Sequence, residues 1–117
     1  MSPADTTPLA HARAVLVEHG LPPRLLPDNV VASAWDPATG ALEATLAAKV
    51  RAAFDGIPVR YATHVRATVR QGHIAELRGV EARFALWVNL TAIHHEGDRL
   101  AFAVGRIQKR LPLAAFR

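Results

Sequence analysis

The stretch of sequence that decides the fold is RFALWVNLTAI, residues 83–93. Every second residue from Phe84 to Ala92 is apolar, whereas the residues between them are mixed. Because the side chains of a strand point alternately to its two faces, this pattern predicts one long strand in the middle of a sheet, over a core. The mixed face carries Trp87, which we expect another element to cover in part.

Length and composition favour a single domain in the cytoplasm. The chain has 117 residues, which predicts one domain over 8–117 after a disordered tail at 1–7. It contains no cysteine, which excludes disulfides and thiol-based metal sites. The first residues show no basic patch followed by an apolar run, so we expect no signal peptide. No stretch has the roughly 18 apolar residues that a membrane-spanning helix needs.

One helix is predicted near the N-terminus. Thr7 and Pro8 form a helix start, with threonine as the N-cap and proline in the first turn. Gly20 is a typical stop, since glycine adopts a left-handed conformation at low cost. The segment 21–29 is rich in proline but remains apolar, so we expect it to plug one end of the core.

The rest of the chain alternates between strand patterns and turn signals, among them Asp55-Gly56 and Gln71-Gly72. Strands are predicted at 30–35, 41–54, 57–62, 65–70, 83–93, 99–105 and 106–111, with a bend or bulge near Ala47-Ala48. Residues 73–77 fit either a short strand or a helical turn. They favour a mainly β fold: about seven or eight strands in an antiparallel sheet that curls or closes into a barrel. The N-terminal helix should pack on Trp87, where Ala85, Ala101 and Ala103 leave room for it.

The positive charge is concentrated in one part of the chain. The formal net charge is +4, and between residues 44 and 75 the only acidic residue is Asp55. A local basic field attracts anionic partners, although arginines also simply solubilise the outer face of strands. We predict an anion-attracting rim made of Lys49, Arg51, Arg60, Arg66 and Arg70.

The predicted interior is aromatic and rich in alanine. Many inward positions are alanine, so we expect the interior to be incompletely filled. An open apolar interior with a basic rim would suit a fatty acid or phospholipid, and no cofactor is required. The side chains expected to line it are Phe54, Tyr61, Phe84, Leu86, Val88 and Phe102.

Residues suited to catalysis or metal binding are sparse. The two serines, Ser2 and Ser33, lie in the tail and inside a strand, where neither would be activated as a nucleophile. His94 and His95 are neighbours on a predicted strand and point to opposite faces, so one ion cannot easily bind both. We therefore predict no catalytic residue and no metal site. The basic strands lack exposed aromatics, which argues against nucleic acid.

The order of several short motifs resembles a known family, domain of unknown function 538. The likeness covers about residues 15–116. It is carried by Gly20-Leu21-Pro22, Leu25-Leu26-Pro27, Phe54-Asp55-Gly56, Gly72-His73-Ile74, Trp87-Val88, Val104-Gly105 and Leu111-Pro112-Leu113. Two departures are Arg24, where the family often has glycine, and the absence of a cysteine near Lys49.

The resemblance implies a barrel-like β domain with an N-terminal helix, a fold likened to lipid-binding bactericidal/permeability-increasing proteins. It also brings a proposed ester-hydrolase role. From the residues and the resemblance together we expect a non-enzymatic domain that binds a lipid or other small amphipathic anion. The alternatives are a protein-interaction scaffold that uses Trp87 and Ile93, and an ester hydrolase.

Overall fold

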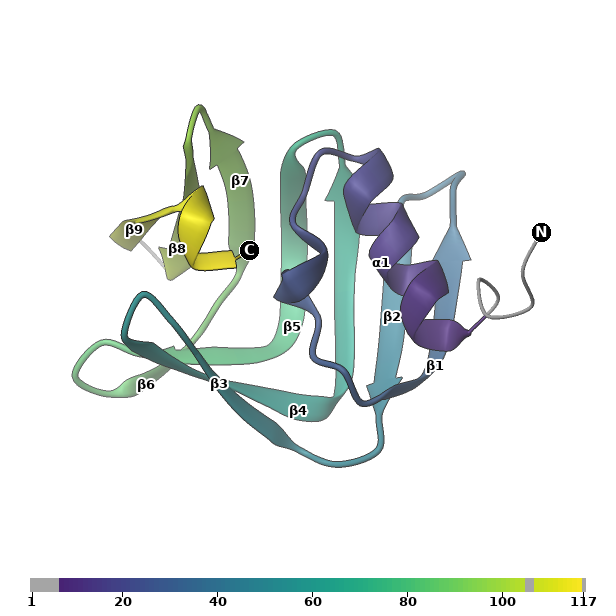
Figure 1. Cartoon of the computed structure of the whole chain (residues 1–117), viewed down its shortest axis with the longest axis horizontal. Helices are drawn as coiled ribbons and strands as arrows, with labels where there is room; N and C mark the ends of the chain where they lie inside the picture. The colour runs from purple at the N-terminus through teal and green to yellow at the C-terminus, as the bar shows by residue number, and fades with distance from the viewer. Residues whose placement is uncertain (1–6, 105–106, 117) are drawn as a thin grey trace.

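The computed structural model describes residues 7–104 and 107–116 (Figure 1). The predicted tail, apart from Thr7, and the predicted strand ends at Gly105 and Arg106 lie outside them. The helical elements are α1 (Pro8–Glu18) and two short 3-10 helices, η2 (Pro23–Leu25) and η3 (Leu113–Phe116). The strands are β1 (Val30–Asp36), β2 (Ala41–Leu46), β3 (Val50–Phe54), β4 (Ile57–Arg70), β5 (His73–Arg83), β6 (Trp87–Asn89), β7 (Ala92–Glu96), β8 (Arg99–Val104) and β9 (Ile107–Pro112).

Helix α1 begins and ends as its sequence predicts. The Thr7 hydroxyl oxygen accepts a hydrogen bond from the Ala10 N–H at 3.1 Å, and Pro8 occupies the first turn. Gly20 follows the helix with a φ of 75°, a left-handed conformation. Ala12, Val15 and Leu16 are buried on one face of the helix. The predicted plug is also confirmed, since Leu21, Leu25 and Leu26 are buried around η2.

The described residues form one antiparallel sheet of nine strands. Seven of them follow one another in the order β1-β2-β4-β5-β7-β8-β9, while β3 pairs with β4 and β6 pairs with β5 beside this path. Strands β2 and β3 lie one after the other along one edge of β4, and β6 and β7 do the same along β5. The break at residues 47–49 between β2 and β3 confirms the predicted bend. The hairpin of the two long strands, β4 and β5, therefore organises the sheet.

The β4–β5 hairpin bends sharply near its middle. The register jumps between the pairs Tyr61–Val80 and Arg66–Arg78, so several residues of β4 oppose Gly79 alone. Gly79 has a φ of 90°, and a Cβ there would collide with the carbonyl oxygen of His64. Only glycine fits this position without strain. Beyond the bend lies a unit that we call the distal arm: β3, β6, residues 57–61 of β4 and residues 80–83 of β5.

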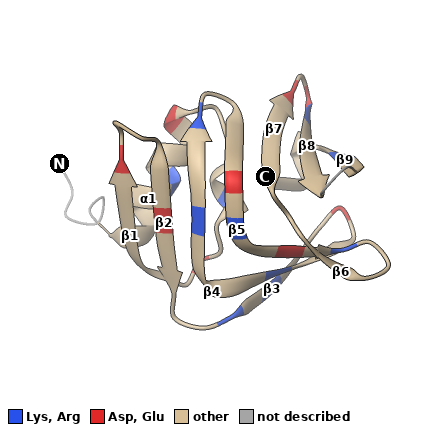
Figure 2. Cartoon of the chain, turned by 180° about the vertical axis from the view of Figure 1, so that it is seen from behind, with Lys and Arg blue, Asp and Glu red and all other residues tan. Residues whose placement is uncertain are grey.

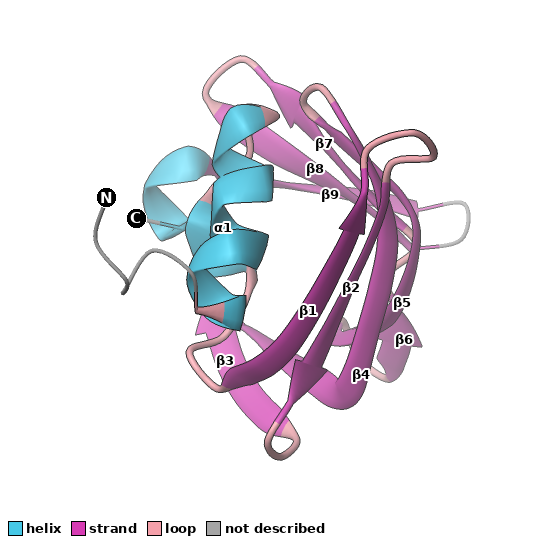
Figure 3. Cartoon of the chain, turned by 90° about the vertical axis from the view of Figure 1, so that its right-hand side faces the viewer, coloured by secondary structure: helices cyan, strands magenta, loops and turns pink. Residues whose placement is uncertain are grey.

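The sheet curls around a core whose open side is covered by helices. Figure 3 shows the strands curving around one side while α1 and the C-terminal 3-10 helix lie on the other. Helix α1 packs mainly on β1, and Leu16 and Phe116 are almost fully buried. Within the described residues no hydrogen-bonded pairing joins β1 to β9, so the sheet is curled but not closed. In the same residues, no helix has the length and apolar character to cross a membrane.

The prediction of one strand over 83–93 is wrong. Strand β5 ends at Arg83, residues 84–86 form a turn, and the chain breaks again at Leu90 and Thr91 before β7. Ala85 has a φ of 128°, which interrupts the alternation of faces. As a result Leu86 is 76 % exposed instead of facing the interior.

The predicted seat of α1 on Trp87 is also wrong. Helix α1 lies against β1 and β2, at the opposite end of the sheet order from β8, which carries Ala101 and Ala103. Trp87 is instead covered by two arginines of the distal arm, with Arg60 Cζ 4.2 Å and Arg51 Cζ 5.7 Å from the centre of its ring. Small side chains on a strand thus did not mark the position of the helix.

Candidate ligand-binding groove

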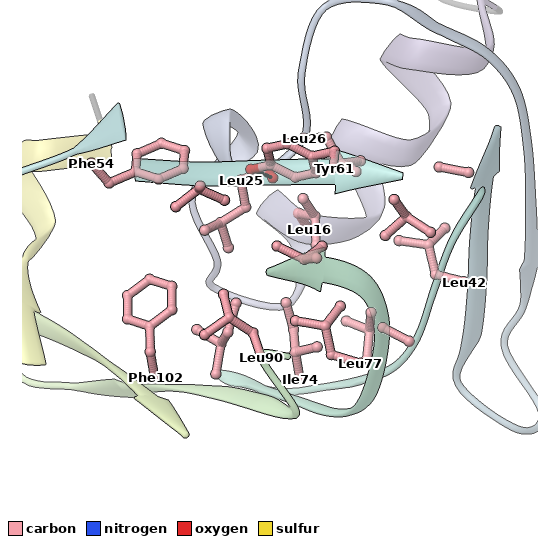
Figure 4. Close-up of a pocket in the computed structure, with 17 residues that line it drawn as sticks. Leu16, Leu25, Leu26, Leu42, Phe54, Tyr61, Ile74, Leu77, Leu90 and Phe102 are labelled. Carbon is pink, nitrogen blue, oxygen red and sulfur yellow. Dashed lines mark hydrogen bonds between the residues drawn. The ribbon is translucent and has the colours of Figure 1, made fainter. Parts of the chain in front are cut away.

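The interior of the curled sheet is nearly filled. A cavity of about 50 Å³ remains at its centre, lined by 17 side chains from α1, the η2 segment and strands on both sides of the bend (Figure 4). Of the side chains predicted to line the interior, Phe54, Tyr61 and Phe102 lie around this cavity. Leu86 is exposed and is not part of the lining, which corrects its predicted position.

Two further residues predicted in the interior lie at its margin. Phe84 is half-buried and packs against the core without reaching the cavity. Val88 is also half-buried and does not line the cavity. Both positions follow from the turn at 84–86, which ends the inward alternation of β5.

Tyr61 is the one polar side chain in the lining of this cavity. Its hydroxyl group donates a hydrogen bond to the Leu25 carbonyl oxygen at 2.7 Å, which satisfies the group although it is buried. Burial raises the pKa of Tyr61 well above its usual value of 10.0, because the phenolate would be desolvated. The residue therefore stays neutral and ties the η2 segment to β4.

A groove of about 460 Å³ lies beside the cavity, between β3 and the chain from Arg24 to Asn29. Its apolar wall includes Val50 and Ala52 of β3. Other surface grooves have similar volumes. This one differs because it shares three lining residues, Leu26, Phe54 and Tyr61, with the central cavity. The groove and the cavity therefore lie on either side of these three apolar or aromatic side chains.

Polar side chains frame the other side of the groove. The Nη2 atom of Arg13 donates hydrogen bonds to the Leu26 carbonyl oxygen and to Oδ1 of Asp28, both at 2.8 Å. Nδ2 of Asn29 donates to the Ala48 carbonyl oxygen at 2.9 Å, and its buried Oδ1 has no hydrogen-bond partner among the described residues. These bonds fix α1, the coil and the loop before β3 relative to one another. Arg13 thus brings a positioned cation to the lining of the groove.

The basic residues predicted as a rim do not surround the cavity. Arg51 of β3 and Arg60, Arg66 and Arg70 of β4 alternate with inward-facing neighbours and lie on the outer face of the sheet. Lys49 is exposed in the loop before β3. Figure 2 shows this outer side, where basic and acidic segments are interspersed on neighbouring strands. The rim prediction is wrong because these basic side chains alternate along their strands with inward-facing residues. They therefore lie on the outer face of the sheet and do not follow the edge of the interior.

Two of these arginines pair with acids on neighbouring strands. Arg60 forms two hydrogen bonds with Glu81, at 2.9 and 3.1 Å, and Arg66 lies 3.6 Å from Glu43. The hydrogen bond from Arg60 is the main reason that the pKa of Glu81 lies below its usual value of 4.5. Two residues of the predicted rim, Arg60 and Arg66, thus take part in ordinary cross-strand ion pairs.

Ser33 and His11 form a contact that the sequence did not reveal. Nδ1 of His11 lies 3.0 Å from Oγ of Ser33, and that hydroxyl group donates to the Pro8 carbonyl oxygen at 2.9 Å. Because the hydroxyl proton is directed at Pro8, the imidazole must donate and cannot act as the base for this serine. The two residues are 22 positions apart, so only the packing of α1 on β1 brings them together. Their arrangement is that of a structural link.

His73 and His94 also meet, on neighbouring strands of the sheet. Their ring centres are 6.0 Å apart in a stacked arrangement, and Nε2 of His94 is 3.5 Å from Glu96. Glu96 in turn is bound by Arg110 at 2.7 Å. In the part of the chain that the structure describes, no group of three or more His, Asp or Glu side chains is arranged to hold a metal ion.

The fold and this groove define a small β protein with a curled, open sheet, a helix-covered apolar interior and a groove beside it. The chain belongs to the family described as protein of unknown function, DUF538, whose model matches residues 12–117. No curated protein and no solved structure matches the chain.

Proposed function

We propose that this chain is a non-enzymatic binding domain for a lipid or other small amphipathic anion, held in the groove beside β3. The observation that carries the proposal is that the groove lies against the apolar interior and shares Leu26, Phe54 and Tyr61 with its lining. An amphipathic molecule needs an apolar channel that opens on a polar or charged edge, and this groove offers both.

The volumes support a position for the ligand in the groove and not in the central cavity. The central cavity of about 50 Å³ holds only one or two groups the size of a water molecule. The groove of about 460 Å³ falls within the range of roughly 300–1,000 Å³ that is typical of ligand pockets. The apolar part of the ligand would therefore lie along the inner face of β3.

The charge of the groove favours an acidic head group. Arg13 and Arg24 both line the groove, and Asp28 is the acid that lines it with them. Arg13 is held in place by its hydrogen bond to the Leu26 carbonyl oxygen and its ion pair with Asp28, so an acidic head group would share this positioned cation with Asp28. Arginine also suits these groups because its planar guanidinium matches their geometry.

A second candidate function, a protein-interaction scaffold, is favoured by a separate feature. Residues 107–110 of β9 are all exposed, and β9 ends the sheet order of the described strands. Such an edge can pair with an extended segment of another protein. The nearly filled interior suits a scaffold as well. By contrast, the geometry of His11 and Ser33 gives no support to an ester hydrolase.

Calorimetric titration with decanoate tests the proposal. Ala52 is a half-buried residue on the groove wall, so Ala52→Trp should obstruct the groove and weaken binding by about tenfold or more. The matched control is Ala34→Trp, at an exposed position of β1 far from the groove lining. Circular dichroism establishes that both variants fold.

We expect wild type and Ala34→Trp to bind decanoate alike. Wild-type protein that binds no decanoate, or an Ala52→Trp variant with wild-type affinity, would contradict the proposal. Binding of an extended peptide that is lost on substitution in β9, without any binding of decanoate, would favour the scaffold.

A further inference from the structure

The turn between β5 and β6 carries the most exposed of the large apolar side chains in the described residues, Leu86. The turn is tight: the Phe84 N–H donates to the Leu86 carbonyl oxygen at 3.1 Å. Figure 1 shows this hairpin projecting at the end of the molecule that is remote from α1. A leucine that is 76 % exposed at the end of a projecting hairpin has almost no cover within its own chain.

The backbone of this turn separates its two large side chains. Phe84 packs against the core, whereas Leu86 points into solvent. Between them, Ala85 has a φ of 128°, a conformation that is strained for any residue with a side chain. The strained residue thus presents Leu86 outward. Strain of this kind is often found where a segment has a function.

Cations gather on the outer face of the distal arm, directly behind the tip. The strand register places Arg51 opposite Arg60 and Arg83 opposite Trp87. The side chains of two directly opposed residues point to the same face of the sheet. Arg60 and Arg51 lie over the Trp87 ring, at 4.2 and 5.7 Å from its centre. Glu81, the acid on this face, is bound to Arg60. Two guanidinium groups therefore lie over one tryptophan, and Arg83, its partner on the neighbouring strand, adds a third positive charge to this face.

We propose that this tip is a docking site for an anionic lipid bilayer. From the tip inward, Leu86 comes first and the pair of Trp87 and Arg83 follows, with Arg51 and Arg60 over the tryptophan ring. The same order suits a bilayer, from acyl chains through the interfacial layer to the phosphates. Leu86 inserts among the acyl chains, Trp87 lies at the interface, and Arg51 and Arg83 contact the head groups. This docking site does not depend on the groove beside β3.

The geometry favours a bilayer over a macromolecular partner. A specific protein interface needs about 800 Å² on each side and a packed core, whereas this tip offers one exposed leucine on a narrow hairpin. Single-stranded nucleic acid would stack its bases on a free aromatic ring. Here the Trp87 ring is already covered by Arg51 and Arg60.

Co-sedimentation with vesicles tests the docking site. The full chain should bind vesicles of mixed phosphatidylcholine and phosphatidylserine, and bind vesicles of phosphatidylcholine alone much more weakly. Leu86→Ser should weaken binding about tenfold, since an inserted leucine side chain is removed. Arg51→Gln should weaken it about fivefold, since one cation near the anionic surface is lost. The matched control is Val31→Ser, which removes another exposed apolar side chain, on β1.

Fluorescence of Trp87 gives a second readout. In a Trp35→Phe variant Trp87 is the single tryptophan, and its emission should shift to the blue on binding mixed vesicles. Unchanged emission would overturn the proposal. It would also be overturned by a lack of sedimentation with mixed vesicles, or by equal losses in Leu86→Ser and Val31→Ser.

Discussion

The two halves of the β4–β5 hairpin have the same strand pattern but different cover. In the half next to the turn at Gln71, the inward side chains Val65 and Val69 face the same cavity as Leu16 of α1. In the distal arm, Val59 and Tyr61 also point inward, but the short η2 segment covers them in place of α1. The groove opens beside this segment. The covering element, rather than the strands, determines where a ligand could enter.

The largest expected effect is at the boundary between the two halves. Gly79→Ala should lower the free energy of unfolding by about 4 kcal/mol or more, because the added Cβ meets the His64 carbonyl at a left-handed φ. Gly97→Ala is the control, since its φ of 59° is also left-handed but no atom lies within 4 Å. It should cost about 1 kcal/mol. Urea denaturation measures both, and equal losses would show that the bend does not require this contact.

On the helix-covered side, Leu16→Ala should cost about 3 kcal/mol, since it enlarges the cavity beneath α1. Val17→Ala, at the neighbouring exposed position, should change stability by less than about 0.5 kcal/mol. Denaturant midpoints compare the two variants. A loss in Leu16→Ala as small as that in Val17→Ala would mean that α1 is not part of the core.

In the distal arm, beneath the η2 segment, Tyr61→Phe should lower the free energy of unfolding by about 1.5 kcal/mol. The substitution keeps the ring but removes the hydrogen bond to Leu25, which leaves a buried carbonyl oxygen without its partner. Thermal unfolding followed by circular dichroism measures the loss. Unchanged stability would indicate that the η2 segment is held by apolar contacts alone.

The smallest expected effect is electrostatic and lies on the outer face of the distal arm. The pKa of Glu81 is lower in the folded protein than its usual 4.5, chiefly because of the hydrogen bond from Arg60. The carboxylate therefore stabilises the fold at neutral pH, and this contribution is lost as the pH falls from 4.5 through the folded-state pKa. Stability measured against pH should decline less steeply there in Arg60→Gln. An identical decline in both proteins would contradict the assignment.

The sequence predicted those parts of the fold that depend on local chemistry. Thr7 and Gly20 bound α1 because capping is decided within one turn of helix. Gly56 and Gly72 adopt positive φ in hairpin turns, where glycine is the expected residue. Phe54, Tyr61 and Phe102 line the interior because alternation holds within each strand.

The errors arose where the chain departs from a regular strand without a glycine to mark it. In 83–93 the apolar alternation continues through a turn whose left-handed residue is Ala85, so the sequence carried no signal for the break. The groove was missed because it depends on long-range packing. Residues as distant as Arg13 and Phe54 line it, and the segment 24–29 that forms its other wall has no periodic pattern.

The most direct test of the central claim is an amide NMR titration of the whole chain with decanoate. If the groove is the binding site, signals of Ala52, Phe54 and Tyr61 shift progressively, while those of Thr68 and Asn89 on the outer face stay in place. Shifts confined to the outer face, or no shifts at any concentration below micelle formation, would contradict it.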